Sequence, residues 1–391
     1  MCNADGVHQT VAAFAVLLVG ARFVWQVQWR VCTKFERKQG DRMRLSISFF
    51  GTYPDLTANM AYALVLEACR RADRLGFMAA WFPERHFDPF GALSPNPALL
   101  AAAVSRETSK LRLRAGSVVL PLHHPLRVAE EWAQVDQLSH GRAEVAFASG
   151  WHSQDFVLNP AAYADRKHHM WRAVDNVRAL WRGESLSLVN GEGEIVAVRS
   201  FPRPLQAELP VWFAALGDPQ TFREAARRDT GVHTNLIQQD TVQLAEKISV
   251  YRSERAAVGL DPGLGKVSVL MHCFVAEAAE DAWEAAHGPL ARYLESSAQL
   301  AARTKRGGMG EAINSLSAGD RAFLFGRAVE RYIHKQSLIG SPSQVRERIA
   351  ALAAIGVDEI ACFVDFGLAP ADILQGIDTL ARHADPEWIG K

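Results

Sequence analysis

The segment LRLRAGSVVLPLHHPLRVAEEWAQVDQLSHGRAEVAFAS, residues 111–149, decides the fold class. It begins and ends with a short apolar run, at 111–120 and 143–149. Between these runs lies a stripe of apolar residues three or four positions apart, which is typical of one buried face of a helix. The stripe consists of Val128, Trp132, Val135 and Leu138. The segment therefore predicts a strand, a helix and a second strand.

The same alternation recurs along most of the chain. The apolar runs are RLSISFF (44–50), FMAAWF (77–82), LRLRAGSVVL (111–120), AEVAFAS (143–149), LPVWFAA (209–215), VHTNLI (232–237), KVSVLMHCFVA (266–276) and DEIACFVDF (358–366). Eight strands alternating with helices predict the α/β class, and within it a closed parallel (β/α)8 TIM barrel with insertions. No GxGxxG follows the first run, which disfavours an open dinucleotide-binding sheet.

Glycine and proline mark the predicted helix ends. Gly76 follows the first helical stretch, and Gly356 is predicted to follow the last one. Ser341 and Pro342 are predicted to open the final helix, because serine caps a helix and proline suits its first position.

Two connections are longer than a barrel requires. Residues 183–208 alternate around a Gly-rich turn and predict a small β-hairpin. Residues 285–337, which include TKRGGMG (304–310), are predicted to form a lid over the strand ends. Lys305 and Arg306 could close over an anion there, or could belong to a solvated basic loop. Apart from these inserts, residues 43–391 are expected to form a single barrel.

The first 42 residues differ from the rest. The apolar run 11–21 ends at Arg22 and is shorter than the roughly 18 to 20 residues that a membrane span needs. The flanking charges do not match a secretory signal, and MRLSISFF from Met43 resembles a natural protein start. Residues 1–42 are therefore interpreted as an N-terminal extension, disordered or upstream of the true start.

Composition excludes several classes of protein. The chain has 43 Lys+Arg and 43 Asp+Glu, so no basic surface is expected to bind nucleic acid or a membrane. Its five cysteines form no CxxC pair and are expected to be buried thiols in a reducing cytoplasm.

Active sites of parallel barrels lie at the carboxyl ends of the strands. The second run ends in WFPERHFDPFG, where Glu84, Arg85, His86 and Asp88 stand among aromatic residues. Ionisable groups in apolar surroundings are costly unless they are paired or used, so a general acid or base is expected here.

Small residues at two further strand ends leave room for a flat ligand. Gly116-Ser117 kinks the third run, and the fourth ends in ASGWHSQDF. A planar cofactor would fill this space. After the fifth run, Gly217, Asp218 and Thr221 stand at a helix start that suits a phosphate group, although Asp218 could simply cap the helix.

The histidines show no metal-binding spacing such as HExxH, so no metal is predicted. His123 and His124 precede Pro125 at a helix start, and His168 and His169 fall on an exposed helix face. Only His86 is placed in the strand-end cluster, where it either transfers protons itself or hydrogen-bonds to a group that does.

Residues 43–367 resemble the bacterial luciferase-like flavin monooxygenases, most densely between 77 and 156. The resemblance is carried by WFPERHFDPFG, by LRAGSVVLPLHHPLRVAEEWAQVDQLSHGR and by ASGWHSQDF. The closest similarity is to a branch associated with polyketide and nonribosomal peptide assembly lines.

The resemblance implies an FMN-using barrel, commonly a homodimer, that receives reduced flavin from a separate reductase. Such an enzyme binds O2 at flavin C4a as a hydroperoxide and oxygenates a small organic substrate, here a natural-product intermediate that could be bound to a carrier protein. It implies that Gly116-Ser117 is a non-prolyl cis peptide. By position, the ring would lie near Phe50, His86, Gly116, Ser117, Ala148 and Ser149, and the phosphate near Trp151, Tyr163, Gly217, Asp218 and Thr221.

The sequence also departs from luciferase. Luciferase has two adjacent histidines where this chain has Arg85 and His86, and a guanidinium cannot accept a proton at neutral pH. Arg85 could hold an anionic flavin or a peroxide oxygen, or pair with Glu84 or Asp88. Luciferase's reactive cysteine and phosphate-binding arginine correspond to Ala148 and Ser149 here, so light emission is not implied.

Three other functions stay open on the sequence. One is a deazaflavin (F420) oxidoreductase on the same barrel, and another is a flavin-binding protein without catalysis. A phosphate-binding lyase or hydrolase is disfavoured, because no lysine or carboxylate pair stands at the strand ends. The substrate and the type of oxygenation are not predicted.

Overall fold

The computed structural model describes residues 43–390, apart from 54, 92, 238 and 303–316. The expectations for residues 1–42 and for TKRGGMG (304–310), including Lys305 and Arg306, lie outside the described residues. Within them, no helix is both long enough and apolar enough to cross a membrane.

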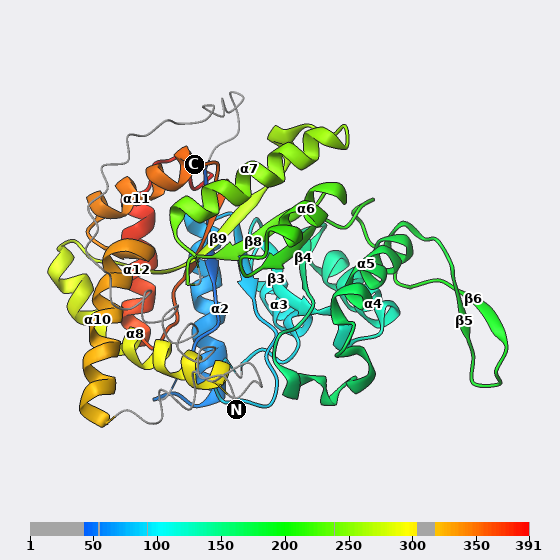
Figure 1. The fold of residues 1–391 in the computed structure, drawn as a ribbon, viewed down its shortest axis with the longest axis horizontal. Coiled ribbons are helices and arrows are strands. Elements are labelled where there is room, and N and C mark those ends of the chain that lie inside the picture. Colours follow the sequence, from blue (N-terminus) through cyan, green and yellow to red (C-terminus); the bar gives the residue numbers. More distant parts are fainter. Residues whose placement is uncertain (1–42, 54, 92, 238, 303–316, 391) are drawn as a thin grey trace, which may run out of the picture.

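Eight parallel strands close into a barrel, as the apolar runs predict (Figure 1). They are β1 (Arg44–Ser48), β2 (Ala79–Phe82), β3 (Arg112–Val119), β4 (Ala143–Ala148), β7 (Val211–Ala215), β8 (Gly231–Asn235), β9 (Val267–Val275) and β11 (Glu359–Phe363). The order is β9-β11-β1-β2-β3-β4-β7-β8, and pairing of β8 with β9 completes the ring.

Helices surround the barrel. They are α2 (Ala58–Leu75), α3 (Pro97–Glu107), α4 (Pro125–Ser139), α5 (Arg166–Arg182), α6 (Pro219–Arg227), α7 (Thr241–Ala257), α8 (Ala279–Ala302), α10 (Ala318–Gln336), α11 (Pro342–Ala354) and α12 (Pro370–His383), with short 3-10 turns η1 (Leu120–Leu122), η2 (Ser153–Val157), η3 (Pro160–Ala162) and η4 (Pro262–Leu264).

Gly76 ends α2 in the left-handed conformation at φ 91°. Ser341 and Pro342 do open a helix, but the prediction that it is the last one is wrong, because α12 follows β11.

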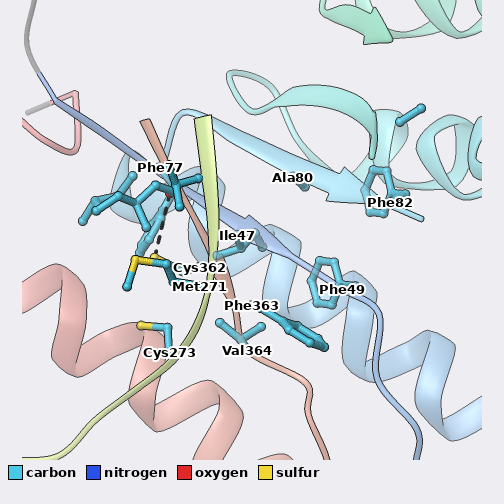
Figure 2. Packing of buried hydrophobic residues seen from close by; sticks show 14 of the residues in the cluster. Ile47, Phe49, Phe77, Ala80, Phe82, Met271, Cys273, Cys362, Phe363 and Val364 are labelled. Atoms are coloured by element: carbon cyan, nitrogen blue, oxygen red, sulfur yellow. Dashed lines mark hydrogen bonds between the residues drawn. The ribbon is translucent and has the colours of Figure 1, made fainter. Parts of the chain in front are cut away.

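The main core lies between the strands and the helices. Figure 2 shows apolar side chains from four neighbouring strands, among them Ile47 on β1, Phe82 on β2, Met271 on β9 and Cys362 on β11. Alternate residues of the same strands point into the barrel. Cys69, Cys273 and Cys362 are buried free thiols, as expected, whereas Cys2 and Cys32 lie outside the described part of the chain.

A charged network closes the barrel near the amino ends of its strands. Arg114, which is 2% exposed, donates from Nε to Glu144 at 2.7 Å and from Nη1 to Glu359 at 2.6 Å. The Trp81 and Trp212 indoles donate to these same two carboxylates, each at 2.9 Å, and both rings flank the guanidinium. The floor of the barrel is therefore filled with paired groups.

The two long connections have their own structure. The first forms the predicted hairpin from β5 (Leu186–Val189) and β6 (Ile195–Val198), which extends away from the barrel (Figure 1). The second supplies α8 and α10, which pack against one another. It is followed by β10 (Leu338–Gly340), a short strand parallel to β9 that the sequence patterns do not predict.

Candidate functional site

The carboxyl ends of β1 to β4 form a partly open surface above a buried barrel. The strand interiors are fully buried, but six residues at these ends are only half-buried. They are Phe50, His86, Gly116, Ser117, Ala148 and Ser149. The Gly116-Ser117 peptide bond is cis, as the resemblance implies. Four of the six, Gly116, Ser117, Ala148 and Ser149, have small side chains, which leave room beside the strand ends. We call the surface formed by these six residues the mouth of the barrel.

Glu84 is the centre of a hydrogen-bonded cluster at the end of β2. Its side chain, 1% exposed, accepts from His86 Nε2 at 2.7 Å, His123 Nε2 at 2.6 Å and the Val119 N–H at 2.7 Å. Burial raises the pKa of Glu84, but the hydrogen bonds from His123 and His86 outweigh it and lower that pKa below its usual range. Glu84 is thus a buried carboxylate held ionised by its neighbours.

His123 corrects the expectation that His86 is the only histidine in this cluster. Burial lowers the pKa of His123, but the hydrogen bond and the charge of Glu84 raise it by more, so the net shift is upward. A surface hollow of about 650 Å³ lies on its outer side, between η1 and α5, and His124 lines it as well. This hollow is not built from the strand ends, so we place the site at the barrel mouth instead.

The nitrogen and oxygen atoms of Glu84, His86 and His123 lie within 4.8 Å of one another, a spacing that a metal ion could bridge. Ligand atoms at about 2.0 to 2.1 Å from one tetrahedral zinc ion stand about 3.3 Å apart. The observed N···O distances of 2.6 and 2.7 Å are shorter, and they are those of hydrogen bonds. These distances fit hydrogen bonds between the three side chains better than ligation of one zinc ion.

Arg85 points elsewhere than the sequence suggests. Its guanidinium pairs with Asp155 of η2, Nη1 to Oδ2 at 3.1 Å, rather than with Glu84. Trp151 lies against it, and His152 Nδ1 lies 3.3 Å from the other Asp155 oxygen. Burial and the charge of Arg85 lower the pKa of His152, so that imidazole is neutral. Asp155 was not among the predicted site residues.

Asp365, just after β11, anchors the chain that leaves β1. It accepts from the backbone N–H groups of Phe50 and Gly51, each at 3.0 Å, and from the Tyr53 hydroxyl. Burial raises the pKa of Asp365 to about 6, against the lowering effect of these hydrogen bonds. The contact fixes Phe50 at the mouth. The sequence shows Asp365 in the last strand run but gives no sign of this role.

At the predicted phosphate end, Asp218 caps α6 by accepting from the Gln220 N–H at 3.0 Å. Its other oxygen is 2.7 Å from Lys167 Nζ, and this hydrogen bond lowers the Asp218 pKa. Gly217 and Thr221 flank the cap. Lys167, which no sequence pattern singles out, therefore offsets the negative charge of the Asp218 cap.

A second pair of residues links Tyr163 to the end of β4. Arg166 donates to the Gly150 carbonyl at 2.9 Å, and its guanidinium lies over the half-exposed Tyr163 ring. Trp151, the next residue, is 44% exposed. Arg166 and Lys167 at the start of α5 thus place two cations near Trp151, Tyr163 and Asp218.

Aromatic side chains from the second insert contact the strand ends. Tyr332 of α10 hydrogen-bonds to His272 of β9 at 2.8 Å, and Tyr293 of α8 packs against Phe90. Burial lowers the pKa of His272 to about 3, so it stays neutral. Phe50 also packs against Phe90. The wall beside the mouth is therefore apolar and aromatic.

Comparisons with known proteins agree with this fold. The family model described as "Luciferase-like monooxygenase" matches residues 43–359. The oxygenase component of a flavin-dependent trigonelline monooxygenase from Acinetobacter baylyi is 28% identical over 320 residues, covering 80% of this chain and 86% of that protein.

Solved structures also match. Monooxygenase RslO1 from Streptomyces bottropensis superposes with a TM-score of 0.73 and 25% identity, covering 88% of this chain and all of that one. The FMN-bound oxygenating constituent of 3,6-diketocamphane monooxygenase from Pseudomonas putida has a TM-score of 0.71 at 18% identity, covers 88% of this chain and 98% of that one, and shows a shared fold. The chain is an enzyme, and it belongs to the family of luciferase-like, flavin-dependent monooxygenases.

Proposed function

We propose that this enzyme uses reduced FMN, supplied by a separate reductase, and O2 to insert one oxygen atom into a small organic substrate. The observation that carries the proposal is the half-buried mouth at the ends of β1 to β4, which lies directly beside the Glu84 cluster. A flat cofactor and a group that manages protons would then share one apolar mouth.

The residues at the mouth fit an isoalloxazine ring. Gly116, Ser117, Ala148 and Ser149 are small enough to let a planar ring lie across the strand ends, and Phe50 would border it. Asp365 holds Phe50 from behind through the backbone. The ring would fit because the side chains at the ends of the adjacent strands β3 and β4 are short, and because Asp365 fixes the backbone of Phe50.

The phosphate end of FMN would lie toward α5 and α6. The amino end of α6 at Gly217, Asp218 and Thr221 offers a helix dipole, and Lys167 offsets the Asp218 charge. Trp151 and Tyr163 would cover this end. The proposal assigns Lys167 a binding role that the resemblance alone does not include.

Reduced FMN, held by these residues, would supply the electrons that activate O2. The protein must hold protons in place and keep out water, because water would divert the oxygen to H2O2. His86, whose Nε2 hydrogen-bonds to the ionised Glu84, is the proton-handling group at the mouth. Phe90 and Tyr293 supply apolar cover, and we propose that the insert at 285–337 acts as the lid.

Rapid mixing of the protein, reduced FMN and O2 tests the proposal. We expect a C4a-adduct absorbance that persists longer than the same adduct does in buffer. The proposal fails if the protein binds no flavin, or if turnover proceeds anaerobically with F420 instead of FMN.

A variant tests the assigned group. We expect His86→Ala to lower product per flavin oxidised by at least tenfold and to raise H2O2 release, with His124→Ala as the control. His124 neighbours the cluster but only caps α4 by accepting from the Leu126 N–H. Unchanged coupling in His86→Ala would remove His86 from the mechanism.

The surroundings of the reaction belong to the same proposal. We propose a cytoplasmic homodimer that acts on a polyketide or nonribosomal peptide intermediate, either free or attached to a carrier protein. Light scattering of the purified protein tests the dimer, and a comparison of free and carrier-bound substrates tests the form of delivery.

A further inference from the structure

The Arg85 guanidinium has one edge, formed by Nε and Nη2, that makes no hydrogen bond. Its side chain is 3% exposed, and Nη1 is held by Asp155, but Nε and Nη2 have no hydrogen-bond partner. Among the described residues it is the one arginine with two buried nitrogens in this condition. The Nε–H and one Nη2–H of a guanidinium point in parallel, which is the geometry that binds both oxygens of a carboxylate.

Arg114 in the same molecule shows how a buried arginine is normally satisfied. It is equally inaccessible, and it donates to two carboxylates at once, Glu144 through Nε and Glu359 through Nη1. Arg85 has one carboxylate partner and one empty edge. Buried donors without acceptors are unfavourable, so a structure that keeps them calls for an explanation.

The protein's own acceptors are held away from this edge. Asp155 lies between Arg85 Nη1 and His152 Nδ1, at 3.1 Å and 3.3 Å, and is fixed by both. Glu84 is occupied by its three donors. A ligand that carries an acceptor would satisfy these two donors.

Arg85 borders the mouth. A Cβ built on Gly91 would lie 3.3 Å from the Phe50 ring and 3.4 Å from Arg85 Cγ, so the Arg85 stem runs beside the residue that borders the proposed ring site. Trp151, 44% exposed, packs against the guanidinium.

We infer that the free edge of Arg85 binds a carboxylate group of the organic substrate, which would make this enzyme selective for acids. The inference rests on the proposed function, because it places the substrate beside the flavin. The substrate carboxylate would then bind on the Nε side of Arg85, as Glu144 does on Arg114, so that one guanidinium holds two carboxylates.

The test measures binding, not turnover. The protein loaded with oxidised FMN is titrated calorimetrically with benzoate and benzamide, and with hexanoate and hexanamide. Each pair has the same shape and differs in charge. We expect at least one acid to bind ten times more tightly than its amide. Arg85→Gln should reduce that preference to less than twofold, and Arg172→Gln, which changes an exposed arginine on α5, should preserve it.

Arg85→Lys shows whether a loss of preference in Arg85→Gln could come from misfolding alone. Lysine keeps the charge that faces Asp155 but lacks two parallel donors, so the preference should fall at least threefold while the thermal midpoint stays close to that of the wild type. The inference is overturned if neither acid outbinds its amide, or if Arg85→Gln retains the preference.

The other source of an anion is the flavin itself. If Arg85→Gln weakens FMN binding tenfold and leaves the acid preference intact, the edge serves the cofactor and the inference is wrong. Failure of the oxygenase proposal has a different signature, because it would leave acid binding intact while no C4a adduct forms.

Discussion

Replacing Glu84 by glutamine removes the charge at the centre of the site while keeping its shape. The carboxylate accepts three hydrogen bonds, from His86 Nε2, His123 Nε2 and the Val119 N–H, at 2.6 to 2.7 Å. Glutamine has one acceptor oxygen, so if that oxygen serves the imidazoles, the Val119 N–H faces an NH2 group. The lost acceptor costs about 1 to 3 kcal/mol, and two charge-assisted hydrogen bonds become weaker by about 1 kcal/mol each. Relief of the buried charge offsets part of this, and we expect a net loss of about 2 to 3 kcal/mol.

The loss should depend on pH in a defined way. The folded pKa of Glu84 lies below 4.5, so its contribution is present above that value and is lost as pH falls through the lowered pKa. The folded pKa of His123 lies above 6.5, so its contribution is present below that value and is lost as pH rises through the raised pKa. The difference between wild type and Glu84→Gln should therefore be largest between about pH 4.5 and 6.5.

Urea unfolding at a series of pH values measures this difference. Glu131→Gln is the control, because Glu131 also raises the His123 pKa but is 24% exposed and pairs with Arg127 on the surface. We expect it to cost less than about 0.5 kcal/mol. A difference for Glu84→Gln below that figure, or one that does not vary with pH, would refute the reasoning about the cluster.

Three further predictions follow from other parts of the molecule. Arg114→Met should cost about 3 to 5 kcal/mol in urea unfolding, because Glu144 and Glu359 would lose their shared buried cation, and a cost below 1 kcal/mol would show that the network is dispensable. Asp365 has a folded pKa of about 6 against a usual value of 3.8, so the stability it adds when protonated is lost as pH rises through 6. The stability advantage of wild type over Asp365→Asn should shrink by about 2 kcal/mol from pH 4 to pH 7, and a constant difference would contradict the raised pKa. Lys167→Met should weaken FMN binding about fivefold by fluorescence titration, since the Asp218 charge would face the phosphate unscreened, and equal affinity in Lys167→Met and Arg172→Met would argue against the phosphate assignment.

The barrel could be predicted from the sequence because its signal is local. Each of the eight apolar runs overlaps a strand, and the Gly-rich connection at 183–208 forms its hairpin. The short strand β10 was missed because three residues carry no periodicity. The predicted helices end at Gly356, so they do not include α12, which follows the last apolar run.

The site was only partly predictable because its contacts join distant positions. Glu84 and His123 are 39 residues apart, Arg85 and Asp155 are 70 apart, and Gly51 and Asp365 are 314 apart. Composition around Glu84 and Arg85 correctly indicated ionisable groups that must be paired. Which partner each takes depends on the closure of the ring and on the turn after β4, and no spacing in the sequence encodes those.

Arg114, Glu144 and Glu359 fill the barrel interior near the amino ends of its strands. A ligand bound at the carboxyl ends can therefore enter and leave only from that side. Of two ligands stacked at this mouth, the inner one would therefore have to bind first and leave last.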